Sequence, residues 1–366
     1  IMQYNFRQID EDVLGKAYET FLAEQRKEEG AFYTPKYITE YMVENTLGKL
    51  CDEILKEAEK AVKTEDLNKL EELVKKLISV KVLDPACGSG SFLIKALRRL
   101  YHTYVKFAEL LKRLKSKHDR WTSLLRPPEV EAKVERINKL LEILTGNGKR
   151  DLISKVLIRH IHGNDLDRRA LEVAKVNLWL EALKLAPQEF RFDRLPRDNN
   201  HILPDLEMNL CNGDSLVGLP ESMTIEFLAK KHKDDIAKLH VLRERYLSNP
   251  TNPELIEKIE KIKYRLRDRL NEEFKKWLND ENLSLEIFSR TKPFHWALEF
   301  WYVFFGKNGK PLHEEKIGFD VIIGNPPYFT IRGKGTGTLK QTFYYRYFQK
   351  SEIWKEVFRS HSDMYY

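Results

Sequence analysis

The stretch at residues 317–328, IGFDVIIGNPPY, decides the fold class, because a short apolar run in it ends at a glycine and two prolines. The run at residues 321–323 is apolar, β-branched and too short for a helix, so it predicts a buried strand. Pro326 and Pro327 cannot continue a central strand, because a proline has no N–H group. We therefore expect Asn325 to be held at the carboxyl end of a strand, where open α/β sheets bind ligands.

The NPPY segment offers two hydrogen-bond acceptors in a stiff frame. The side-chain oxygen of Asn325 and the backbone oxygen of Pro326 suit a planar NH₂ group, which has two hydrogens to donate. The ring of Tyr328 could stack on the aromatic ring that carries this NH₂ group. The alternative is a structural Pro-Pro turn that closes a strand, with Asn325 as a cap.

A second segment, DPACGSGS, follows a short strand predicted at residues 80–83 and precedes a helix predicted from Phe92 to about residue 100. Gly88 and Gly90 allow the backbone to approach a ligand closely, as in nucleotide-binding loops. The third glycine of the dinucleotide fingerprint and the GxxxxGK[ST] phosphate loop are both absent from the sequence. The alternative is an ordinary glycine-rich turn between a strand and a helix.

Asp84, which opens the DPACGSGS segment, gives the expected ligand a charge preference. A carboxylate there would repel a phosphate and favour a cation. A sulfonium amino acid that carries a free ammonium group fits that preference.

Two further segments end in acidic residues. A strand predicted at residues 156–163 leads to Asp165, which is placed to hold a ribose diol, and to Leu166, which could pack on an adenine ring. Asp167 is better placed as a helix N-cap. A strand predicted at residues 206–210 leads to Asp214, which either accepts from an adenine amine or forms an Asx-turn.

Thr34 and Pro35 predict the start of a helix, with Thr34 as N-cap and Pro35 at the first helical position. The functional alternative is that Thr34 and the free N–H groups behind it hold a ligand carboxylate. His160 and His162 alternate on the predicted second strand, and we expect them to be structural. The aromatic and basic segment at residues 343–359 suits either a nucleic-acid groove or the core face of an amphipathic helix.

The chain has 366 residues, a formal net charge of +7 and three widely spaced cysteines. The length allows an α/β core with additions, and the basic balance permits a polyanionic partner. The cysteine spacing argues against a disulfide framework or a zinc site and fits a reducing, cytoplasmic location. We expect no membrane span, because the sequence contains no run of about 18 apolar residues.

The order FYTP, DPACGSG, NDLD, NGDSL, NPPY resembles the γ class of S-adenosylmethionine-dependent N6-adenine DNA methyltransferases, and chiefly the large restriction–modification enzymes: type IIG restriction–methyltransferases and type I modification subunits. The resemblance implies a Rossmann-like α/β fold with a doubly wound, mostly parallel sheet. It also implies an N-terminal helical segment at residues 1–29 and a catalytic domain at residues 30–366, with helical insertions at about 101–150 and 221–300. Target-recognition and nuclease domains would lie outside this sequence, so we expect the natural polypeptide to be longer.

The resemblance also implies roles for individual residues. The methionine end of S-adenosylmethionine, its ribose and its adenine would be bound by Tyr33, Thr34, Asp84, Ala86, Gly88, Gly90, Asp165, Leu166 and Asp214. A flipped adenine from double-stranded DNA would be bound by Asn325, Pro326, Pro327 and Tyr328, without a metal. The alternatives are a modification subunit that needs a specificity partner and a protein-glutamine methyltransferase, which also uses an NPPY-type site.

Overall fold

The structure, a computed structural model, describes residues 34–118, 127–189, 202–283, 285, 288, 291–326, 330–332, 339–350 and 361–363. The predicted N-terminal helical segment at residues 1–29 lies outside this part of the chain. Three predicted site residues, Tyr33, Pro327 and Tyr328, lie outside it as well.

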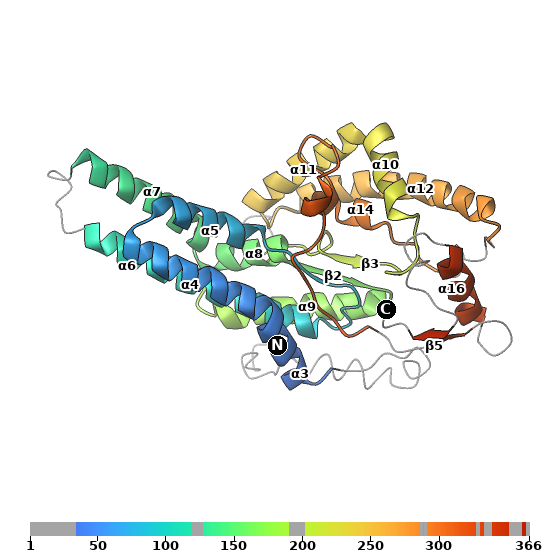
Figure 1. Cartoon of the computed structure of the whole chain (residues 1–366), viewed down its shortest axis with the longest axis horizontal. Helices are drawn as coiled ribbons and strands as arrows, with labels where there is room; N and C mark the ends of the chain where they lie inside the picture. The colour runs from blue at the N-terminus through green and yellow to red at the C-terminus, as the bar shows by residue number, and fades with distance from the viewer. Residues whose placement is uncertain are drawn as a thin grey trace.

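A parallel four-stranded sheet is at the centre of the described fold (Figure 1). Its order is β3-β2-β1-β4, with all neighbouring pairs parallel. The strands are β1 (Val82–Asp84), β2 (Ile161–Asp165), β3 (Leu210–Asn212) and β4 (Val321–Ile322). A parallel sheet needs crossover connections, and helices supply them on both faces, so the predicted α/β fold is confirmed.

The second and third strands begin later than predicted. Residues 149–160 form helix α8 (Lys149–His160), because its apolar residues recur at helical spacing and are buried in the core. At the third strand, the backbone oxygen of Leu206 accepts from the N–H groups of Asn209 and Leu210. This turn occupies the residues for which a strand was predicted, and β3 starts only at Leu210.

The prediction of a buried strand at residues 321–323 is only partly right. Ile323 is buried, but Ile322 is 63% exposed. The reason is the position of β4 at the end of the sheet order, where within the described residues it pairs with β1 alone. One face of the strand end is therefore in the core while the other is open.

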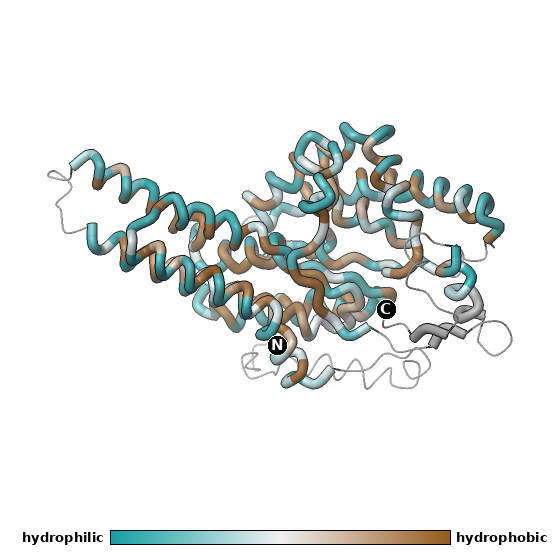
Figure 2. The backbone as a smooth tube through the Cα atoms, in the orientation of Figure 1, coloured by the Kyte–Doolittle hydropathy of each residue, from teal (hydrophilic) through white to brown (hydrophobic). Residues whose placement is uncertain are grey.

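The helices that precede β2 form an arm, which projects to the left in Figure 1. After α3 (Lys36–Val43) and the short π-helix η2 (Glu44–Gly48), the arm contains α4 (Lys49–Thr64), α5 (Leu67–Ser79), α6 (Ser91–His118) and α7 (Pro128–Thr145). Helices α4 and α5 are rich in Lys and Glu, yet each buries one apolar face against its neighbours (Figure 2). Their Lys and Glu residues occupy only the outer face.

The two faces of the sheet carry different helices. Figure 1 shows α9 (Arg168–Leu185) on one side and a second helical group on the other. This second group contains α10 (Glu221–Lys231), α11 (Lys233–Ser248), α12 (Pro253–Asp280), α14 (Trp296–Glu299) and α15 (Trp301–Phe304). The remaining elements are η4 (Glu314–Lys316), β5 (Thr330–Arg332), α16 (Leu339–Lys350) and β6 (His361–Asp363), with β5 and β6 antiparallel.

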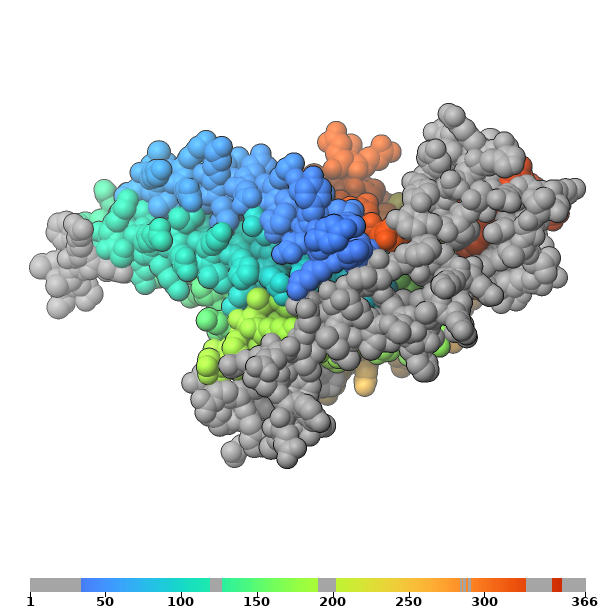
Figure 3. Space-filling model, turned by 90° about the horizontal axis from the view of Figure 1, so that it is seen from below, coloured from blue at the N-terminus to red at the C-terminus, as the bar shows by residue number. Residues whose placement is uncertain are grey.

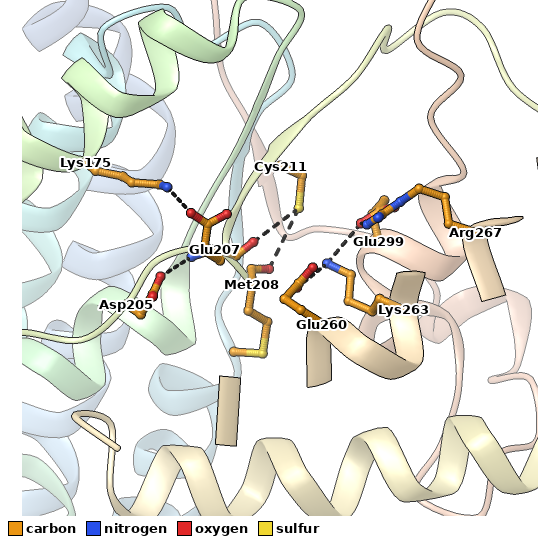
Figure 4. Close-up of polar contacts among 9 residues, drawn as sticks. All are labelled: Lys175, Asp205, Glu207, Met208, Cys211, Glu260, Lys263, Arg267 and Glu299. Atoms are coloured by element: carbon orange, nitrogen blue, oxygen red, sulfur yellow. Dashed lines mark hydrogen bonds and ion pairs between the residues drawn. The ribbon is translucent and has the colours of Figure 1, made fainter. Parts of the chain in front are cut away.

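A buried ion cluster joins α12 to α14 (Figure 4). The carboxylate of Glu299 accepts from Nε and Nη2 of Arg267 at 2.7 and 3.0 Å, and it lies 2.9 Å from Nζ of Lys263. Lys263 is only 1% exposed and also pairs with Glu260. Charges buried this deeply stabilise a fold only when each has its partner, so the cluster specifies how the long helix docks.

Within the described residues, every helix is too short or too polar to cross a membrane.

Candidate active site

The predicted site segments follow the four strands at the same edge of the sheet. Residues 85–90 follow β1, residues 166–167 follow β2, residues 213–216 follow β3 and residues 323–326 follow β4. Because the strands are parallel, all four segments lie at their carboxyl ends. The sheet thus brings together motifs that are up to about 240 residues apart in the sequence.

The backbone of the DPACGSGS loop departs from ordinary geometry at two glycines. Gly88 has φ +52° and Gly90 has φ +86°, both in the region that favours glycine. A Cβ atom on Gly88 would meet nothing within 4 Å, whereas one on Gly90 would come within 3.1 Å of Cβ of Ala174 in α9. Gly90 therefore allows the loop to pack on a helix, while Gly88 leaves open space for a ligand.

Asp165 connects the loop to the end of β2. Its Oδ2 accepts from the Gly88 N–H at 2.8 Å, and its Oδ1 accepts from the Asp167 N–H at 2.8 Å. Asp167 itself caps α9 by accepting from the Arg169 N–H at 2.9 Å, so its predicted N-cap role is confirmed. Leu166, between the two acids, is 45% exposed, which leaves its side chain accessible to a ligand.

Asp84 is buried, and its pKa is raised. Its Oδ1 accepts from the Ala86 N–H at 3.1 Å, whereas its buried Oδ2 has no hydrogen-bond partner in the described part of the chain. The pKa of Asp84 is raised to about 8, chiefly by burial and in part by the nearby charge of Asp165, while the hydrogen bond from the Ala86 N–H opposes the rise. A buried carboxyl oxygen without a partner is suited to a cationic group that supplies the missing hydrogen bond.

The segment that follows β4 lies directly against Asp84. A Cβ atom on Gly324 would come within 2.5 Å of Asp84 Oδ1, so only a glycine allows the end of β4 to approach this closely. The segment is positioned by Asp320, whose carboxylate accepts from the Lys81 N–H at 2.7 Å, and by the Ile323 N–H, which donates to the Leu83 oxygen at 2.9 Å. The glycine loop and residues 324–326 therefore lie side by side.

Thr34 does not cap the following helix as predicted. Helix α3 begins at Lys36 with Pro35 as its N-cap, one residue later than expected, and it has no side-chain capping bond. The hydroxyl oxygen of Thr34 instead accepts from Nδ2 of Asn325 at 2.9 Å. In Figure 3 the dark-blue atoms of α3 lie beside orange-red atoms of the segment that ends at Pro326.

Asp214 is buried, and each of its two carboxylate oxygens accepts a hydrogen bond. Its Oδ1 accepts from the Leu216 N–H at 3.1 Å, as in an Asx-turn, and its Oδ2 accepts from the Tyr344 hydroxyl at 2.5 Å. Burial raises the pKa of Tyr344, and Asp214 adds to this effect, so the phenol remains a hydrogen-bond donor. An ionised carboxylate has about four acceptor positions, which leaves capacity for a ligand amine.

Helix α16 contains the first part of the aromatic and basic segment at residues 343–359, for which two interpretations were given. Tyr344, Tyr347 and Phe348 are buried, and the Tyr347 hydroxyl contacts the N–H and the carbonyl oxygen of Gly218. These aromatic side chains therefore form the core face of an amphipathic helix. The nucleic-acid interpretation does not apply to them.

Several polar residues that hold the site together were not predicted from the sequence. Nδ2 of Asn164 donates to the Gly213 oxygen at 3.0 Å and to the Ser215 hydroxyl at 2.6 Å, and Ser215 in turn donates to the Pro85 oxygen. Nδ2 of Asn177, in α9, donates to the Ser89 oxygen at 2.9 Å. Asn164 and Ser215 lie inside the recognised motifs, but nothing in the sequence distinguishes Asn177 from a surface residue of its helix.

His160 and His162 have structural partners. Nε2 of His160 lies 2.9 Å from the Tyr104 hydroxyl, and its Nδ1 lies 2.6 Å from the Val80 oxygen. Nδ1 of His162 lies 3.1 Å from the Val82 oxygen in β1. Burial lowers the pKa of His160 to about 3, so its ring is neutral. Within the described residues no three His, Cys, Asp or Glu side chains are grouped as metal ligands.

The cysteines of the site are unsuited to nucleophilic catalysis. Burial raises the pKa of the Cys87 thiol far above its ordinary value and that of the Cys211 thiol to about 12. The groups that can act chemically are therefore the three acids, the open glycine loop and the Asn325 amide. Together they fit a cationic ligand next to a group that accepts hydrogen bonds from an amine.

Two family models match this sequence. The Eco57I restriction-modification methylase matches residues 159–366, and the DNA-methyltransferase domain of MmeI matches residues 56–216. The first match covers more than half of the chain and includes the ends of three of the four strands. The second covers the glycine loop.

One curated relative is a putative type II restriction enzyme and methyltransferase from Methanocaldococcus jannaschii, RM.MjaORFECS2P. It is 26% identical over 402 residues, which include 88% of this chain. The chain spans about 30% of the length of that relative.

Proposed function

Because the chain belongs to the Eco57I family of restriction-modification methylases, we propose that it transfers a methyl group from S-adenosylmethionine to the N6 amine of a flipped-out adenine in DNA. We also propose that it is the modification module of a larger restriction–modification protein of the type IIG kind. The observation that carries the proposal is the close approach of Gly324, which directly precedes Asn325, to Asp84 at the start of the DPACGSGS segment.

The cofactor fits the residues at the edge of the sheet. Oδ2 of Asp84, which has no partner among the residues that the structure describes, would accept from the ammonium group. The open space over Gly88 would receive the amino-acid end of the ligand. Asp165 would hold the ribose, with Leu166 against the adenine ring and Asp214 on its amine. When bound, S-adenosylmethionine supplies a methyl group on a positively charged sulfur.

The roles of the catalytic segment follow from hydrogen bonding. The target adenine must leave the duplex, because its N6 amine is otherwise engaged in base pairing. The side-chain oxygen of Asn325 and the backbone oxygen of Pro326 would each accept a hydrogen bond from the amine. The nitrogen lone pair would then point away from these two oxygens. We propose that Tyr328 stacks on the base and that Pro327 keeps the segment rigid. The amine gains the methyl group and then loses a proton, so no strong base is required before transfer.

The test is detection of N6-methyladenine in DNA incubated with S-adenosylmethionine and the protein that carries this chain. Asn325→Ala should lower kcat by a factor of about 10² to 10³, on the scale of one lost preorganised hydrogen bond. Its affinity for S-adenosylmethionine, measured by calorimetry, should change little. Normal methylation by Asn325→Ala would contradict the role proposed for Asn325.

The same assay separates the alternatives. Methyl transfer to a glutamine-containing peptide, with none to DNA, would identify a protein-glutamine methyltransferase. Activity that is absent until a specificity subunit is added would identify a modification subunit of a larger complex. The relative's description as both restriction enzyme and methyltransferase favours a single-chain arrangement.

A further inference from the structure

The hydrogen bond between Thr34 and Asn325 connects two segments that are 291 residues apart. Its donor is Nδ2 of Asn325 and its acceptor is the hydroxyl oxygen of Thr34, at 2.9 Å. Thr34 directly precedes the N-cap of α3, and the Ile38 and Thr39 N–H groups both donate to the Pro35 oxygen. Its backbone is therefore anchored at the start of a well-formed helix.

The geometry of a primary amide gives this contact a chemical consequence. The amide group is planar, so holding its nitrogen determines the direction of its oxygen. Rotation of the Asn325 side chain by a half turn about χ2 would exchange the two and present NH₂ to the NH₂ of a substrate. Torsions of this kind are broad and roughly two-fold, so the backbone alone does not select one orientation.

We propose that Thr34 is a positioning residue for Asn325: its hydroxyl group holds the amide at the place from which the side-chain oxygen faces the amine that is methylated. This inference rests on the proposed function, because it assigns Asn325 to the substrate amine. It differs from the role in which Thr34 binds the carboxylate of the cofactor, because it places the effect of Thr34 on the methyl-accepting group.

The two roles of Thr34 predict different kinetics. Thr34→Val keeps the shape of the side chain and removes the hydroxyl oxygen. If Thr34 positions Asn325, this substitution should lower kcat at saturating S-adenosylmethionine by about 10- to 100-fold, because reacting groups that are not held in the right geometry react more slowly. The Kd for S-adenosylmethionine should stay within about threefold. A residue that only binds the cofactor should instead raise that Kd and leave the saturated kcat unchanged.

Two variants complete the experiment. Thr34→Ser retains a hydroxyl and should recover most of the lost kcat. Thr39→Val removes a hydroxyl on the same helix that donates to the Lys36 oxygen at 2.9 Å, and should leave kcat unchanged. Equal thermal midpoints for these variants and the unmodified protein show that the fold is intact.

The failure of this inference can be told apart from failure of the proposed function. If the unmodified protein methylates DNA and Thr34→Val has a normal saturated kcat, the positioning role is overturned and the proposed function stands. The positioning role is also overturned if Thr34→Val loses kcat as expected but Thr34→Ser does not recover it, since the missing hydroxyl group would then not be the cause of the loss. If the unmodified protein methylates a peptide and not DNA, the proposed function fails.

Discussion

At the scale of single residues, the surroundings of Asp84 favour a ligand with a positive charge. Its carboxyl group is buried beside Gly324 and close to the charge of Asp165, and one of its oxygens has no hydrogen-bond partner among the described residues. With a pKa raised to about 8, the group is mostly protonated at pH 7 in the free protein. A bound ammonium group would favour the carboxylate, so ligand binding and proton release are coupled.

This coupling predicts how cofactor affinity depends on pH. Only the ionised Asp84 can pair with the ammonium group, so affinity for S-adenosylmethionine should rise by up to tenfold per pH unit between about pH 6 and 7. The rise should end near pH 8 and the affinity should fall above it, because an α-ammonium group loses its own proton at about pH 8. Calorimetry at pH 7 in two buffers of different ionisation enthalpy should show release of close to one proton. Asp84→Asn should bind more weakly at pH 8 and remove both effects. A flat pH profile for the unmodified protein would contradict the prediction.

At the scale of elements, the docking of α12 depends on the ion cluster of Lys263, Arg267 and Glu299. Burial acts to raise the pKa of Glu299, but the charges of Lys263 and Arg267 outweigh it and hold that pKa well below its usual range. A depressed carboxyl pKa contributes stability above the unfolded-state pKa, and this contribution is lost as the pH falls through that value toward the folded-state pKa. The cluster should therefore stabilise the fold at neutral pH and weaken in acid.

We expect Glu299→Gln to lower the free energy of unfolding by about 3 to 5 kcal/mol, because it removes the buried carboxylate that pairs with both Lys263 and Arg267. Urea unfolding at pH 7 measures the loss. Glu272→Gln, which breaks an exposed pair with Lys275 on the same helix, is the matched control and should cost less than about 1 kcal/mol. Equal losses for the two variants would show that burial of the cluster has no energetic consequence.

At the scale of the whole molecule, the positive net charge of +7 matches a polyanionic substrate. Affinity of the protein that carries this chain for duplex DNA should fall at least tenfold between roughly 50 and 200 mM salt, because each neutralised phosphate releases bound counterions. The affinity for S-adenosylmethionine should change much less, because buried charges are screened less than exposed ones. Fluorescence anisotropy with labelled DNA and calorimetry with the cofactor measure the two. DNA binding that is independent of salt would exclude phosphate contacts as its source.

Sequence reasoning identified the fold class and the segments at the site because these signals are local. A short apolar run before Gly-Asn-Pro-Pro, and a glycine loop that opens with Asp84, are recognisable within about ten residues. Strand limits were less accurate: residues 156–160 are apolar enough for a strand, but their spacing continues a buried helix. Proline and glycine marked the ends of elements better than hydrophobicity marked their beginnings.

By itself, the sequence determined the fold class and predicted which residues carry the chemistry, since both depend on short local patterns. Only the tertiary structure decided that the Thr34 hydroxyl holds Asn325, that Tyr344 contacts Asp214 and that Lys263 pairs with Glu299. Each of these contacts joins residues far apart in the chain. Such a pair leaves no periodic trace in either segment, because the partner's position depends on how the sheet and its helices pack.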